Sequence, residues 1–209
     1  MSDGLEDLAQ SIGGVRALAA MLRRVRADRE LSPEQLAARV ESTTAYVSAL
    51  ESARVLDPTL LTVALLADGC EVSVSLFVAS FALPLGDPLP WPRERRPPDD
   101  HPHVRLAGPR AFGATLRDER YRLNWSTAEL AARVRVSRSR IGTLERGQVA
   151  APTLLTVTQL AYALATTTTR RIAYATQLAQ SYAGEIAAPR LRRVGAMPDL
   201  HEPPRAPDS

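Results

Sequence analysis

Apolar residues recur along this chain at intervals of three and four positions, the spacing that places them on one face of an α-helix. Within residues 110–187 this spacing defines an expected core. Its members are Leu116, Leu123, Leu130, Val134, Ile141, Leu144, Leu154, Val157, Leu160 and Leu164. Residues 15–83 repeat the same spacing. The pattern predicts an all-α fold.

Hydroxyl side chains mark the expected helix starts. Ser126 stands three residues before Glu129, the spacing of a capping box, in which each side chain bonds the other residue's free backbone N–H. Ser32 and Gln35 repeat it, with Pro33 at the first helical position, where its missing N–H costs nothing. Further starts are expected after Thr43, Thr59, Ser137 and Thr153. Both halves should therefore contain short helices joined by tight turns.

The two halves are copies of one unit. Residues 22–67 align without a gap on residues 116–161, an offset of 94, and 20 of the 46 positions are identical. Both copies contain the segments Leu-Ala-Ala-Arg-Val and Pro-Thr-Leu-Leu-Thr-Val at matching positions. Chance similarity between alanine-rich helices would not keep register over this length, so the sequence indicates a duplication.

The segments that flank the two copies differ from them in amino-acid composition. Residues 84–109 hold 8 of the 16 prolines, a density that blocks helix formation. We therefore expect the divisions that follow. They are an acidic segment (1–14), a first domain (15–83), a proline-rich linker (84–109), a basic second domain (110–187) and a disordered tail (188–209).

Positive charge is concentrated in the second copy. The whole chain carries a formal net charge of +3, yet residues 104–184 hold 12 arginines against 4 acidic residues, a net +8. All 26 basic residues are arginine, which is typical of a GC-rich bacterial coding sequence and makes arginine abundance alone weak support for phosphate binding. The uneven distribution is more informative, and it favours a polyanionic partner for residues 104–184.

Several classes of function find no support in the sequence. No apolar run approaches the roughly 18 residues that span a membrane, and the acidic start is unlike a signal peptide, so we expect a cytoplasmic location. Cys70 is the only cysteine and is expected in the core, while His101 and His103 lack further ligands for a metal. We find no nucleophile–base arrangement and no phosphate-binding glycine loop, and so expect no enzyme activity, cofactor or small-molecule ligand.

The order of motifs in residues 126–147 resembles the Cro and phage-repressor type of helix-turn-helix, the XRE family. A capped helix with Leu130-Ala131 leads through a turn to a second helix that ends in Leu144-Glu145-Arg146-Gly147. The resemblance implies two tandem lambda-repressor-like domains of four to five helices each, and a structural role for Glu51 and Glu145. The family places glycine in the turn where a left-handed backbone is needed, whereas this chain has Arg135 and Glu41. The first copy is the more degenerate.

The resemblance also implies which side chains meet DNA, because the second helix of the motif lies in the major groove. The expected base contacts are Arg138, Ser139 and Thr143. The expected phosphate contacts are Thr127, Arg135, Ser137, Arg140 and Arg146. In the first copy Thr43, Thr44 and Tyr46 are candidate secondary contacts, and whether that copy reads DNA stays open. Clustered arginines at a helix start are mildly unfavourable without an anion, which independently supports a phosphate partner.

These observations predict a sequence-specific, nucleoid-associated transcription regulator of double-stranded DNA, with repression the commoner mode in the family. The apolar residues Val72, Val74, Leu76, Phe77, Val78 and Phe81 predict a homodimer through residues 70–83. A pseudo-dimer within one chain is the alternative. Two other functions stay open: an antitoxin- or adaptor-like protein-interaction module, and a DNA binder in replication, partition or mobile-element maintenance.

Overall fold

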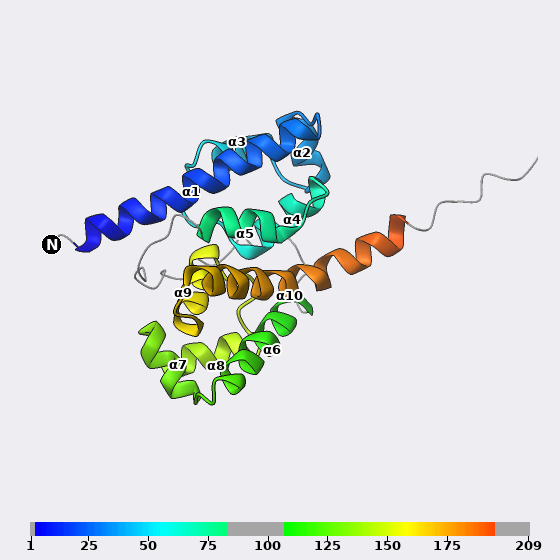
Figure 1. The fold of residues 1–209 in the computed structure, drawn as a ribbon. Helices are drawn as coiled ribbons and strands as arrows, with labels where there is room; N and C mark the ends of the chain where they lie inside the picture. Colours follow the sequence, from blue (N-terminus) through cyan, green and yellow to red (C-terminus); the bar gives the residue numbers. More distant parts are fainter. Residues whose placement is uncertain (1–2, 83–106, 195–209) are drawn as a thin grey trace, which may run out of the picture.

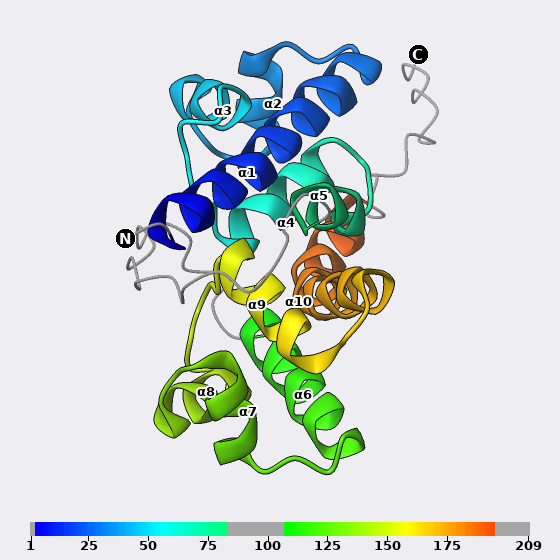
Figure 2. The same ribbon diagram turned by 60° about the vertical axis from the view of Figure 1, so that its left-hand side comes forward.

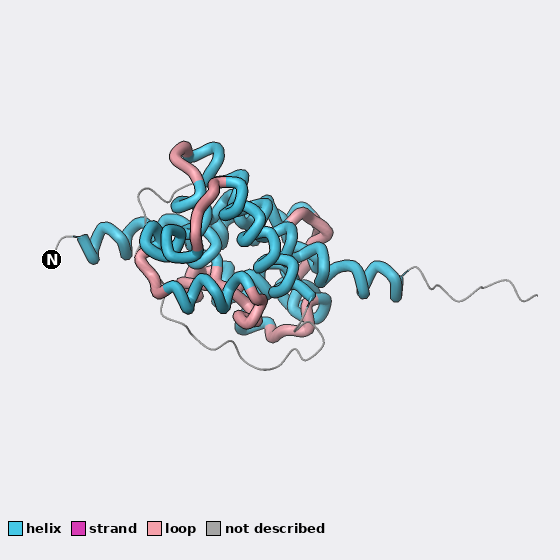
Figure 3. Tube along the Cα trace, turned by 90° about the horizontal axis from the view of Figure 1, so that it is seen from below, coloured by secondary structure: helices cyan, strands magenta, loops and turns pink. Residues whose placement is uncertain are grey.

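Ten α-helices make up the part of the chain that this computed structural model describes, with the backbone given for residues 3–82 and 107–194 and side chains for residues 13–82 and 108–184. The first five are α1 (Asp3–Asp28), α2 (Pro33–Arg39), α3 (Thr44–Glu51), α4 (Leu60–Gly69) and α5 (Val74–Ala82). The second five are α6 (Ala107–Arg122), α7 (Thr127–Val134), α8 (Arg138–Glu145), α9 (Leu154–Leu164) and α10 (Thr168–Val194). The described residues contain helices and loops and no named strand, which confirms the all-α prediction (Figures 1 and 3).

The helix starts are capped as the sequence predicts. Ser32 with Gln35 and Ser126 with Glu129 both form complete capping boxes. Thr43, Ser137, Thr59 and Thr153 each accept a hydrogen bond from the backbone N–H three residues further on. Each cap satisfies a donor that the first turn of a helix leaves without a partner. Local sequence therefore determines where these helices begin.

The two copies also bend the backbone at equivalent positions. The turn between α7 and α8 passes through Arg135 at φ 59°, and the turn between α2 and α3 passes through Glu41 at φ 51°. This confirms the left-handed turn that the family resemblance implied, with a strain of about 1 kcal/mol at each non-glycine residue. A second matched pair lies after the next helix, with Ala53 at φ 57° and Gly147 at φ 66°. The repeat is thus structural as well as sequential.

A buried ion pair ties the end of α8 to α6. Arg120 donates to both carboxylate oxygens of Glu145, at 2.6 and 2.9 Å, and to the carbonyl oxygen of Trp125 at 2.7 Å. Both side chains are at most 7% exposed. The hydrogen bonds to Glu145 raise the pKa of Arg120 above its ordinary value. Arg26 and Glu51 form the same pair in the first copy, so the structural role expected for both glutamates is confirmed.

The copies meet through equivalent residues. The backbone N–H of Leu60 donates to the carbonyl oxygen of Pro152 at 2.7 Å, and that of Leu154 donates to Pro58 at 3.0 Å. Thr59 and Thr153 thereby form an antiparallel bridge between matching positions of the repeat. Such reciprocity is the signature of a two-fold relation, here within one chain. In Figures 1 and 2 the α2–α3 and α7–α8 pairs lie at opposite ends of the molecule, separated by α4, α5, α9 and α10.

Most apolar side chains of residues 70–82 pack within the chain, although Leu76 stays 38% exposed, whereas the sequence predicted a homodimer interface at residues 70–83. Phe77, Val78 and Phe81 are at most 1% exposed, because α5 packs against α1 and against α10. Gln180 of α10 also donates to the hydroxyl of Ser75 at 2.6 Å. The excess apolar surface was inferred correctly. Its cover is α10 of the same molecule, which a spacing pattern cannot reveal.

The structure confirms the predicted burial of Cys70 and shifts two of the predicted segment boundaries. Cys70 is fully buried, as predicted, and burial raises the pKa of its thiol. Residues 3–14 of the acidic segment form the start of α1, and α10 continues to Val194, beyond the predicted start of the disordered tail. Most of the predicted linker, including His101 and His103, lies outside the described residues. In the described ranges no helix combines the length and apolar character that crossing a membrane requires.

We expect Arg120→Met to lower the free energy of unfolding by about 3–5 kcal/mol, because it leaves the carboxylate of Glu145 buried without its partner. The double variant Arg120→Met with Glu145→Leu should recover much of this loss, since neither charge then remains. Urea unfolding followed by circular dichroism measures both changes. A double variant as unstable as the single one would show that the pair is not an isolated electrostatic unit.

Candidate nucleic-acid interface

Helix α8 presents its first turn to solvent and its opposite face to the core. Ile141 and Leu144 are at most 1% exposed, whereas Arg138 and Ser139 are exposed. Ser137 accepts a hydrogen bond from the backbone N–H of Arg140 at 3.1 Å and so fixes where the helix begins. The core contacts and the buried pair at Glu145 hold the inner face and the C-terminal end of the helix. Its first turn is left at the surface, with Arg138 and Ser139 exposed.

A cleft of about 490 Å³ lies beside this turn, between α6, α7 and α8. It is lined by Arg117, Thr127, Arg138, Ser139, Gly142, Glu145 and Arg146. Three guanidinium groups thus line one cleft, while the single carboxylate there, Glu145, already pairs with Arg120. Arg117 also lies 3.9 Å from the carboxylate of Glu145, so that carboxylate is shared between two arginines. Arg138 and Arg146 add positive charge to the same cleft, which favours an anion such as phosphate there.

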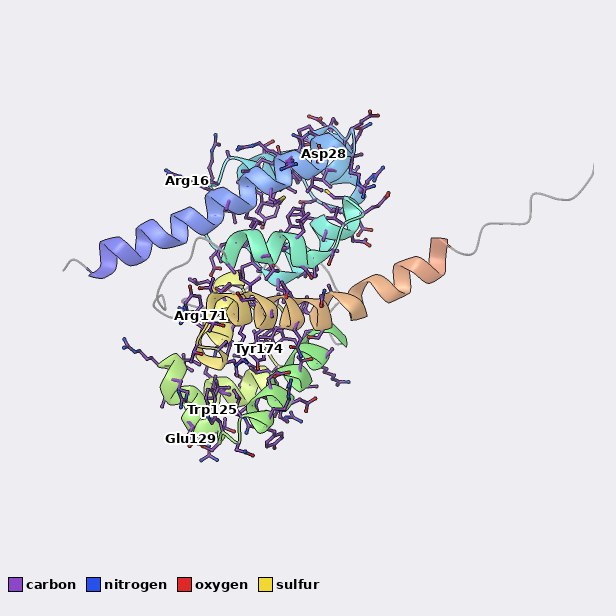
Figure 4. All side chains as sticks on the ribbon, viewed as in Figure 1. Arg16, Asp28, Trp125, Glu129, Arg171 and Tyr174 are labelled. Carbon is purple, nitrogen blue, oxygen red and sulfur yellow. The ribbon has the colours of Figure 1, made fainter. Side chains whose placement is uncertain are left out.

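Four of the residues predicted from sequence line this cleft. They are Thr127, Arg138, Ser139 and Arg146. Arg135 and Ser137 are also exposed, just before α8, although they do not line the cleft. These six residues lie on or next to α7 and α8, which in Figure 4 are at the end of the molecule marked by Trp125 and Glu129.

Two predicted contacts are less available than sequence suggested. The hydroxyl of Thr143 donates to the carbonyl oxygen of Arg140 at 2.8 Å, so it can offer another group only its lone pairs and its methyl. Arg140 is half-buried with its Nε inside the protein, and burial lowers the pKa of its guanidinium. Both side chains face the domain as much as the solvent. Their assignments as DNA contacts remain predictions.

Arg117 was not among the contacts predicted from the sequence. Its guanidinium donates to the carbonyl oxygen of Glu145 at 2.7 Å and lines the cleft. The side chain of Arg117 is 42% exposed. A signal was present in the repeat, because Arg23 occupies the same position in the first copy. The family pattern used for the assignment began at Ser126 and therefore did not reach α6.

Several other arginines of the second copy have structural roles. Arg133 stacks on the ring of Trp125 at 4.0 Å, Arg171 stacks on Tyr162 at 4.1 Å, and Arg122 pairs with Glu119 at 2.9 Å. The net +8 of this segment already subtracts Glu119, and stacking on a ring leaves a guanidinium charged. These contacts therefore orient the three arginines away from the cleft without removing their positive charge.

In the first copy the candidate contacts present little charge. Thr43 caps α3, Thr44 is half-buried, and the ring of Tyr46 is 37% exposed with its hydroxyl 3.5 Å from that of Thr62. Thr44 stands where the second copy has Arg138, and Tyr46 where it has Arg140. The two copies therefore have the same helical fold and differ in the exposed side chains at the starts of α3 and α8.

Comparison with known proteins agrees with this geometry. A family model described as a helix-turn-helix domain matches residues 17–77 and again residues 111–173, together more than half of the chain. No curated protein and no solved structure matches the chain. The two matched ranges include α2–α3 and α7–α8, the pairs that form the helix-turn-helix units. The chain therefore belongs to the XRE-like helix-turn-helix family and carries two tandem copies of its domain.

Proposed function

We propose that this protein binds double-stranded DNA in a sequence-specific manner and regulates transcription, with α8 in the major groove. The arginine-lined cleft beside the first turn of α8 carries this proposal. Arg138 and Ser139 stand at the exposed start of the helix, where side chains of this motif reach base edges. Thr127, Arg146 and Arg117 lie around them and would hold phosphates, which position the protein without reading sequence.

A single chain supplies two helix-turn-helix units related by a local two-fold. Family members that dimerise bring two recognition helices to successive major grooves about 34–36 Å apart. Here α3 and α8 occur in one molecule, and their surfaces differ. We therefore favour a pseudo-dimer on an asymmetric DNA site over the homodimer through residues 70–83. Repression is the proposed mode, through occupation of the site, and the nucleoid is the proposed location.

Two other functions compete with regulation. A protein-interaction module of the antitoxin or adaptor type would not require three guanidinium groups around one cleft. A DNA binder in replication, partition or mobile-element maintenance would use the same surface. Genome-wide mapping of bound sites separates the second alternative from regulation, because regulatory sites concentrate upstream of transcription units.

Two arginine substitutions separate base contact from phosphate contact. Arg138→Ala should weaken binding to the best site by about 1–3 kcal/mol and relax the preference at one base pair, because a guanidinium can bond a guanine edge through two hydrogen bonds. Arg146→Ala should weaken all sequences alike, since phosphates carry no sequence information. Sequence selection from a random DNA pool, followed by titration on the selected site, measures both effects.

Arg170→Ala provides the matched control. It removes the same charge from an exposed position at the start of α10, away from the cleft. Selection with this variant should return the wild-type site. An unchanged base preference in Arg138→Ala would refute the assignment of that residue to a base edge.

Light scattering tests whether the protein is a monomer or a homodimer. Because α10 covers α5 within one chain, multi-angle light scattering at tens of micromolar should give the monomer mass of 22.7 kDa. Phe77→Asp should unfold the protein instead of dissociating a dimer, because Phe77 is 1% exposed and a buried carboxylate is strongly unfavourable there. A dimer mass in the wild type, with a folded and monomeric Phe77→Asp, would restore the homodimer interface.

A further inference from the structure

The corner that follows the recognition helix is built identically in the two copies. Gly147 donates from its backbone to Leu144 and Gln148 to Thr143, at 3.0 and 2.9 Å. Ala53 donates to Leu50 at 3.1 Å and Arg54 to Ala49 at 2.9 Å, which are the equivalent bonds of the first copy. The left-handed φ values at Gly147 and Ala53 also agree, at 66° and 57°. Arg54 therefore leaves the backbone where Gln148 does.

Positions 146 and 148 lie within contact of each other at this corner. In the second copy the Nε of Arg146 donates to the side-chain oxygen of Gln148 at 3.2 Å. The equivalent positions of the first copy hold Ser52 and Arg54. Both copies therefore have an exposed arginine at this corner, two residues later in the first copy than in the second. The hydroxyl of Ser52 turns back to the carbonyl oxygen of Ser48 at 2.7 Å.

A second guanidinium is retained beside it. Arg23 of α1 donates to the carbonyl oxygen of Glu51 at 2.6 Å, as Arg117 donates to Glu145 at 2.7 Å. Both arginines are thus anchored to the carbonyl at the end of the recognition helix. Arg117 lines the cleft with Arg146 in the second copy. Arg23 and Arg54 are the exposed arginines of the first copy at the corresponding corner.

The base-reading positions have not been retained. Thr44, Ala45 and Ala49 stand where the second copy has Arg138, Ser139 and Thr143. Glu41 stands in place of Arg135, which removes a positive charge from the turn. Around its recognition helix the first copy has therefore kept arginines at the corner equivalent to Arg117 and Arg146, and has none at the start of that helix.

We propose that the first copy holds DNA by its phosphates through Arg23 and Arg54 and does not read bases, so that α8 alone carries sequence preference. This inference rests on the proposed DNA-binding function. The site on DNA then has one specific half, facing α8, and one flank of any sequence, facing α3. Phosphate contacts on the flank fix the position of the chain and add affinity without adding information.

The test uses the full chain with Arg54→Gln, which installs the residue found at the equivalent position of the second copy. On a duplex that contains the specific half-site and the flank, the slope of log K against log salt should lose about 0.9, the value of one phosphate contact. On a duplex truncated at the end of the specific half-site, the slope for Arg54→Gln should equal the slope for the wild type on the same truncated duplex. Replacing the flank by scrambled sequence should change affinity less than about twofold.

Arg24→Gln is the matched control. Arg24 is an exposed neighbour on α1, next to Asp28, and makes no contact with Glu51. Its slope should match the wild type on both duplexes, and circular dichroism should show all three proteins equally folded. If Arg54→Gln behaves as Arg24→Gln does, or if scrambling the flank lowers affinity tenfold, the inference is overturned while the proposed function stands. A wild type that binds no duplex would overturn both.

Discussion

The antiparallel bridge between Thr59 and Thr153 is the constraint on which the arrangement of this molecule depends. It joins equivalent residues, so each copy offers the other the same donor and the same acceptor. A two-fold relation follows from that reciprocity, and with it the placement of the two helix-turn-helix units at opposite ends of the molecule (Figure 2). The bridge is also asymmetric in detail, since Asp57 accepts from the backbone of Leu155 and its counterpart, Ala151, has no carboxylate.

Covalent linkage changes what such a pair of units can do on DNA. In a dimer of separate chains both surfaces are identical, so both half-sites must be alike. In one chain the copies are free to diverge, and here they have, with arginines at the start of α8 and small uncharged residues at the start of α3. If both units bind DNA as proposed, the second would bind at a high effective concentration once the first has docked. Weak contacts by one copy would then strengthen specific contacts by the other.

The candidate site was predictable where it depends on local signals. Ser137 and Ser126 cap helices as their spacing indicates, and Arg138, Ser139 and Arg146 emerge on the exposed surface expected of them. The burial of Arg140 and the position of Arg117 beside the cleft were not predictable in this way. Each depends on how a side chain of one helix meets another helix distant in sequence. The residue pattern of a single helix does not show which other helix its side chains will contact.

The sequence by itself determined the all-α fold, the duplication, the helix starts and the concentration of charge in the second copy, because these follow from periodicity, capping and composition along the chain. It also determined that α5 exposes more apolar surface than its own copy can bury. Only the tertiary structure decided what covers that surface. An apolar face is satisfied equally by a second molecule or by another helix of the same one, and α10 occupies it here because the bridge at Thr59 and Thr153 brings the two copies together.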